Sequence, residues 1–133
     1  MRVATRIEYP RLAAGVQDTL EELGMTYLTN HGKAVTEFEV QSPCHFRILV
    51  EEHTEESFGF PFVNRGGSET ALELHKDLAT PESDPVLRQH ASAFVRGLVA
   101  ALPDPPWKGF GIFRGRSEKN RWKDLEAFPG PQD

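Results

Sequence analysis

Two stretches of the chain repeat apolar residues at the three- and four-residue spacing of an amphipathic helix. The first covers residues 10–23, with Pro10 at its start and Gly24 just after its end. The second begins at Asp84 and Pro85, a capping residue and a residue suited to the first helical position. The apolar stripes are Leu12, Val16, Leu20 and Leu23 in the first, and Leu87, Ala91, Phe94, Val95, Leu98 and Leu102 in the second. Each segment is predicted to be a helix that buries one side.

Apolar and polar residues alternate after the first helix, as they do in strands with one wet face. The predicted strands cover residues 2–9 ahead of that helix, and 25–30, 35–41 and 45–52 after it. Gly32 favours a hairpin turn over residues 30–33, because glycine takes positive φ without steric cost. On the wet face, Glu37 and Glu39 are expected to lie near Arg47. The pattern indicates an antiparallel meander.

The middle of the chain carries weaker patterns. Residues 51–56 are mostly acidic and predict a charged loop, while residues 57–63 are aromatic, with Pro61 typical of an edge strand. Ser68 is a suitable cap for a short helix. The apolar stripe of that helix would be Ala71, Leu74, His75 and Leu78. A last strand is expected over residues 108–114.

The expected elements follow the order β-α-β-β-β-(β)-α-α, with the further strand optional. This order predicts an α+β fold, a single-layer antiparallel sheet with helices packed on one face. A length of 133 residues fits one domain. We expect that domain over residues 1–114, followed by a basic C-terminal tail over residues 115–133 that is either loosely ordered or a short helix.

The chain has a single cysteine, Cys44, which excludes an intrachain disulfide and any zinc site with more than one thiolate. Its first residues lack the apolar core of a signal peptide. No apolar run approaches the roughly 18 residues that a membrane span requires. Together these features predict a cytoplasmic protein that does not bind membranes.

The net charge of −5 is distributed unevenly. Residues 1–107 hold nine Lys or Arg and sixteen Asp or Glu, whereas residues 108–123 hold six basic residues and one acidic residue. We therefore expect the body of the protein to repel polyanions and the tail to attract them.

The loop before the expected helix at Ser68 is a candidate anion-binding site. Gly66 and Gly67 would let the backbone approach a ligand, and Arg65 would donate to a phosphate or carboxylate. The alternative is a flexible turn with a serine cap, which is favoured because Glu69 in the first turn would repel an anion. The full phosphate-loop pattern is absent.

The tail is a candidate nucleic-acid interface, because basic side chains neutralise phosphates and aromatic ones stack on unpaired bases. The candidate residues are Trp107, Lys108, Arg114, Arg116, Arg121 and Trp122. The alternative is a packed strand whose cations lie over acidic surface, and the acidic body favours this alternative.

Three phenylalanines at period two, Phe58, Phe60 and Phe62, form a candidate interface. On an edge strand they would meet a second subunit or an added peptide strand, and otherwise they belong to the core.

No catalytic set, metal site or cofactor site is predicted. The histidines lack an i, i+4 pair, and His75 on an apolar stripe is typical of a hydrogen-bonded core residue. Cys44 and His45 are adjacent on a strand, where neighbouring side chains point to opposite faces, so Cys44 is expected to be a buried, inert thiol.

The helix and meander over residues 11–52, together with the acidic charge, resemble the opening of small type III secretion chaperones. That resemblance implies a dimeric, peptide-holding role and favours binding over catalysis. We expect a non-enzymatic protein-interaction or adaptor module that forms homo-oligomers. The alternatives are a single-stranded RNA or DNA binder that uses the tail, and a small-anion binder or enzyme that uses Arg65–Ser68.

Overall fold

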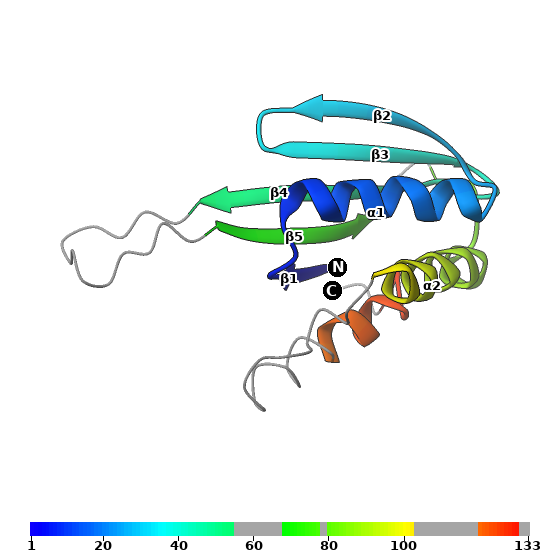
Figure 1. Ribbon diagram of the computed structural model, residues 1–133. Helices are drawn as coiled ribbons and strands as arrows, with labels where there is room; N and C mark the ends of the chain where they lie inside the picture. The colour runs from blue at the N-terminus through cyan, green and yellow to red at the C-terminus, as the bar shows by residue number, and fades with distance from the viewer. Residues whose placement is uncertain (55–67, 78–79, 103–119, 131–133) are drawn as a thin grey trace, which may run out of the picture.

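The computed structural model describes residues 1–54, 68–77, 80–102 and 120–130 of the chain. Its elements are β1 (Arg2–Thr5), α1 (Tyr9–Glu22), β2 (Thr26–Gly32), β3 (Val35–Ser42), β4 (Phe46–Thr54), β5 (Ser68–His75) and α2 (Asp84–Ala101). The five strands form one antiparallel sheet in the order β1-β5-β4-β3-β2, and Figure 1 shows α1 and α2 on the same face of it. The predicted α+β fold is therefore confirmed.

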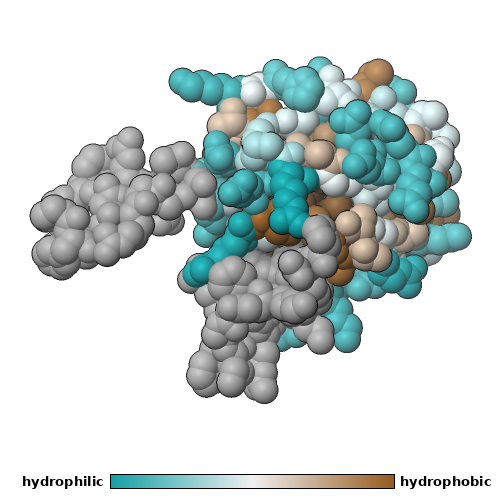
Figure 2. Space-filling view, viewed as in Figure 1, coloured by the Kyte–Doolittle hydropathy of each residue, from teal (hydrophilic) through white to brown (hydrophobic). Residues whose placement is uncertain are grey.

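The core lies between this face of the sheet and the two helices. Leu20 of α1, Phe38 of β3, Ile48 of β4 and Phe94 of α2 are each no more than 1% exposed and belong to a single cluster. The cluster is held by close packing, and the rings of Phe46 and Phe94 meet edge to face at 6.4 Å between centroids. Seen from the helix side, the described surface is mostly hydrophilic (Figure 2).

The helix α1 spans Tyr9–Glu22, one residue earlier at each end than the predicted 10–23, and the strand expected over residues 2–9 ends at Thr5. Pro10 lies in the first turn of α1, and Gly24 takes a φ of 73° just beyond its end. This conformation turns the chain back, and the amide of Met25 donates to the carbonyl oxygen of Leu20 at 2.9 Å. The chain is thereby directed into β2, at the far edge of the sheet from β1.

The predicted helix at Ser68 is wrong, because these residues form β5, a central strand between β1 and β4. The segment fits both the helical repeat of 3.6 residues and the strand repeat of two residues. On a helix, one side would carry Ala71, Leu74 and His75, whereas on a strand one face carries Thr70, Leu72 and Leu74. The strand prevails because β1 and β4 provide hydrogen-bonding partners on both sides. Tertiary pairing thus overrides a local pattern.

Two smaller expectations are also corrected. The residue with positive φ at the β2–β3 turn is Ala34, at 59°, while Gly32 belongs to β2. A Cβ atom on Gly32 would lie 2.9 Å from the Cγ1 atom of Val35, so glycine lets the backbone of β2 approach the Val35 side chain closely. The expected loop over residues 51–56 is strand as far as Thr54, because β4 continues alongside β5.

The C-terminal tail contributes to the core. Residues 120–125 are helical, and Trp122, Leu125 and Phe128 are each at most 2% exposed in the same cluster as the helices and sheet. Of the two alternatives expected for the tail, the short helix is therefore the one that the structure shows within residues 120–130. The strands expected over residues 57–63 and 108–114 lie outside the described residues.

Candidate functional site

The face of the sheet away from the helices, called the open face here, is polar. By register and alternation it presents Arg2, Ala4, Leu28, Asn30, Val35, Glu37, Glu39, Arg47, Leu49, Glu51, His53, Glu69, Ala71, Glu73 and His75. Five of these residues are glutamates and two are arginines, so the open face carries a net negative charge. It is the wet face that the alternation predicts.

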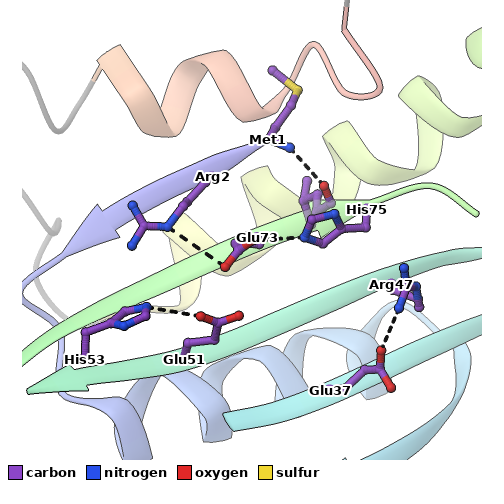
Figure 3. A network of polar contacts seen from close by, with 9 residues as sticks. Met1, Arg2, Glu37, Arg47, Glu51, His53, Glu73 and His75 are labelled. Carbon is purple, nitrogen blue, oxygen red and sulfur yellow. Dashed lines mark hydrogen bonds and ion pairs between the residues drawn. The ribbon is translucent and has the colours of Figure 1, made fainter. Parts of the chain in front are cut away.

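Glu73 is the centre of a polar network on the open face (Figure 3). Its carboxylate lies 2.9 Å from the Nε2 atom of His75 and 3.9 Å from the Nε atom of Arg2. Partial burial acts to raise the pKa of Glu73, but hydrogen bonds with His75 and Glu51 and the charges of His75 and Arg2 outweigh it and lower the pKa. Glu51 in turn lies 3.1 Å from the Nε2 atom of His53. Each acidic side chain of this network therefore has a basic side chain within the network as its partner.

Arg47 forms the second polar group of the open face. Its Nη1 atom donates to Glu37 at 3.1 Å, and its Nε atom lies 2.8 Å from the Oδ1 atom of Asp77. Glu39 is directly opposite Arg47 in the register, yet the ion pair forms with Glu37 diagonally. The expected proximity of Arg47 and Glu37 is confirmed as an ion pair, whereas Glu39 forms no ion pair with Arg47.

The histidines do not form a metal centre within the described part of the chain, where no three His, Cys, Asp or Glu side chains are grouped to hold an ion. His75 is on the open face of β5, beside Glu73, and not on an apolar helical stripe as expected. The change of element explains the difference, because alternation on β5 separates His75 from the buried Leu72 and Leu74.

Cys44 is buried, as predicted, and faces the core. Burial, followed by the negative charge of Glu82, raises the pKa of the Cys44 thiol to about 11. His45 turns outward, and its Nδ1 atom lies 3.1 Å from the Oε2 atom of Glu82. His45 is therefore not placed to activate the thiol, and burial with a raised pKa supports an inert Cys44.

We expect Cys44 to resist alkylation by iodoacetamide in the folded protein at pH 8 and to react once the chain is unfolded in urea. The reagent needs an accessible thiolate, and the raised pKa keeps the thiol protonated. Mass spectrometry of the labelled chain measures both states. Because the folded pKa is raised, this thiol stabilises the fold below its ordinary pKa and loses that contribution as the pH rises toward 11. Rapid labelling of the native protein at pH 8 would contradict the assignment.

The edge strand β2 is the most accessible strand of the sheet. Six of its seven residues are exposed, and Leu28, at 51%, is the most exposed large hydrophobic side chain among the described residues. It holds no Lys, Arg, Asp, Glu or Pro, whereas each of the other strands carries a charged residue. Proteins commonly protect an edge with charge, proline or short length, and β1, the opposite edge, is only four residues long and contains Arg2.

The turn at Lys33 and Ala34 determines which backbone groups of β2 face outward. A two-residue turn closes on the pair Gly32 and Val35, and the closing pair of such a hairpin is hydrogen-bonded. Alternate pairs along the ladder are not hydrogen-bonded, so it follows that the outward N–H and C=O groups of β2 belong to Tyr27, Thr29 and His31. They form a regular row that an added strand can use.

The structure brings few of the sequence-predicted site residues together. Arg65, Gly66, Gly67, Phe58, Phe60, Phe62, Trp107, Lys108, Arg114 and Arg116 lie outside the described residues. Ser68 begins a strand, so the anion site loses the helix N-terminus on which it was argued. Arg121 is exposed, but Trp122 is 1% exposed and cannot stack on a base.

Sequence reasoning missed β2 as the candidate site and assigned the edge to the aromatic segment. The available signal was composition: the segment Thr26–Gly32 is the one described strand that lacks formal charge. Lack of charge indicates an interaction site only when the strand is known to be an edge, because strands in the middle of a sheet are commonly uncharged.

Comparison of the chain with known protein families and with curated proteins finds no match in either case. Among the described residues, no helix combines the length and apolar character needed to cross a membrane. The functional argument therefore rests on the geometry of the sheet.

Proposed function

We propose that the protein is a cytoplasmic protein-interaction module without catalytic activity, which binds a partner by adding a strand of that partner to the β2 edge. The observation that carries the proposal is the exposed and uncharged edge, with outward backbone groups at Tyr27, Thr29 and His31. Strand addition derives affinity from main-chain hydrogen bonds and specificity from alternate side chains.

The packing beneath β2 supports this role, because an edge that receives a strand must itself be held in place. Tyr27 meets the ring of Phe38 edge to face at 5.8 Å and donates from its hydroxyl to Glu21 at 2.7 Å. Asn30 donates to Glu37 at 3.3 Å on the open face. Anchored on both faces, β2 is a pre-formed template, which reduces the entropy lost on binding.

A second copy of the chain is one partner that the edge would accept. Antiparallel pairing about Thr29 would place Leu28 against Asn30 and Tyr27 against His31, without a pair of like charges across the new ladder. Light scattering over a concentration series measures this association. A dimer that Thr29→Pro converts to a monomer would make the homo-oligomer the relevant complex.

The test of strand addition compares Thr29→Pro with Thr29→Val on an array of extended synthetic peptides. Proline removes the outward N–H of Thr29, while valine keeps it, and an edge strand tolerates either residue. We expect the proline variant to bind selected peptides about tenfold more weakly or worse, with the valine variant close to wild type. Urea denaturation should give the two variants similar free energies of unfolding.

Amide hydrogen exchange supplies the structural readout. The N–H groups of Tyr27, Thr29 and His31 should exchange rapidly in the free protein and become protected in a saturated peptide complex. Binding that leaves these amides unprotected, or that Thr29→Pro does not weaken, would refute strand addition at β2.

A further inference from the structure

Acidic side chains lie on both sides of the uncharged β2 edge. On the open face, Glu39 and Glu37 are the cross-strand neighbours of Leu28 and Asn30. On the helix side, the end of α1 brings Asp18 and Glu21 toward β2: Tyr27 donates to Glu21, and the negative charge of Asp18 also acts on Tyr27. A strand added at β2 would therefore enter a negative potential from either face.

The end of α1 carries the charge that a helix C-terminus disfavours. Its last turn, which the structure describes in full, holds Glu21 and Glu22 and no basic residue. Carbonyl groups at a helix C-terminus already provide partial negative charge, which cations stabilise and anions destabilise. Hydrogen bonds from Tyr27 and Gln17 lower the pKa of Glu21, so its charge persists at neutral pH. This arrangement favours a cationic partner.

Two of these acids have no partner within the described part of the chain. Glu37 is paired with Arg47, and Glu21 accepts from Tyr27 and Gln17. Glu39 and Asp18, by contrast, make no hydrogen bond or ion pair with a described residue. One unpaired carboxylate thus lies on the open face and one lies on the helix side.

The distances suit lysine or arginine on an added strand. Glu39 is on β3, so a new strand beside β2 would run about 10 Å from its backbone, two strand spacings away. Between them lies Leu28, 51% exposed. A long basic side chain can lay its aliphatic stem on a leucine and extend its charged end to a carboxylate. The exposed leucine and the unmatched glutamate therefore fit one type of side chain.

We propose that the strand received by β2 belongs to a basic, extended peptide segment, whose Lys or Arg side chains reach Glu39 on the open face or Asp18 on the helix side. This inference rests on the proposed function, because it names the chemistry of the partner at the same edge. A second acidic copy is the competing occupant, and it would lack the cations that these carboxylates favour.

The experiment uses three synthetic peptides of about eight residues, which fit one strand. Thr alternates with Lys in the first, with Gln in the second and with Glu in the third. Fluorescence anisotropy should give the tightest binding for the Lys peptide, and its Kd should rise with salt because the charges are exposed. Exchange protection of Thr29 should accompany that binding.

The variant Asp18→Asn/Glu39→Gln removes the two unpaired charges beside β2, and Glu69→Gln/Asp124→Asn removes the same net charge far from β2. We expect the first variant to weaken binding of the Lys peptide about threefold to tenfold and the second to leave it nearly unchanged. Equal binding of the Lys and Gln peptides, with Thr29 protected by both, would overturn the basic partner and leave strand addition intact. Protection of Thr29 by none of the peptides or the array would overturn both proposals.

Discussion

Replacing Trp122 by alanine should lower the free energy of unfolding by about 3–5 kcal/mol. The indole is 1% exposed and is the largest of the fully buried side chains among the described residues. It packs in one cluster with Leu125 and Phe128, together with residues of the sheet and of α1 and α2. Removing it would leave a cavity that its neighbours fill only in part. Urea denaturation followed by circular dichroism measures the loss.

The exposed neighbour Arg121 gives the matched control, since Arg121→Ala should change the free energy of unfolding by no more than about 0.5 kcal/mol. If the C-terminal segment were a loose tail, the tryptophan variant would behave like the arginine one. Equal, small effects of both substitutions would therefore contradict the packing of residues 120–130.

Trp122→Phe separates the volume of the indole from its polar atom. The Nε1–H group is buried and has no hydrogen-bond partner in the structure described above. An unsatisfied buried donor costs about 1–3 kcal/mol, which phenylalanine would recover while it loses some packing. We therefore expect this variant to fall well short of the alanine variant in its effect. A loss as large as that of alanine would mean that the indole N–H is satisfied.

The sequence predicts most of the elements because their periodicity is local. A few helical turns are enough to identify the buried side of α1 and α2, and a few alternating residues are enough for β3 and β4. The buried sides of these four elements supply Leu20, Phe38, Ile48 and Phe94, which belong to one core cluster. Boundaries such as Thr54 were missed because they depend on a neighbouring strand.

The candidate site was beyond local reasoning, because an edge is a property of strand order. β2 follows α1 in the chain but lies at the opposite side of the sheet from β1. The place of β1 at that opposite edge depends on β5, which enters between β1 and β4 and was expected to be a helix. The acids around β2 come from α1 and β3, whose proximity is likewise set by the fold. Only the lack of charge in Thr26–Gly32 was visible beforehand.

The assignment of β5 as a central strand predicts that Leu72→Asp will abolish stable folding. Leu72 is 0% exposed and lies between Val3 of β1 and Val50 of β4. A carboxylate there would be buried without a partner, which costs several kcal/mol and can exceed the whole stability of a small domain. On the helix expected from the sequence, Leu72 falls outside the apolar stripe, and aspartate would be harmless.

Two further variants keep this prediction measurable. Leu72→Ala should fold and lose about 2–5 kcal/mol in urea denaturation, because it leaves a cavity without burying a charge. His75→Lys should be tolerated, since His75 is on the open face, where the carboxylate of Glu73 can pair with a positive charge. A helix would reverse this order, because its stripe buries His75 and leaves Leu72 in water. A stable Leu72→Asp protein beside an unfolded His75→Lys protein would therefore contradict the position of β5 as a strand between β1 and β4.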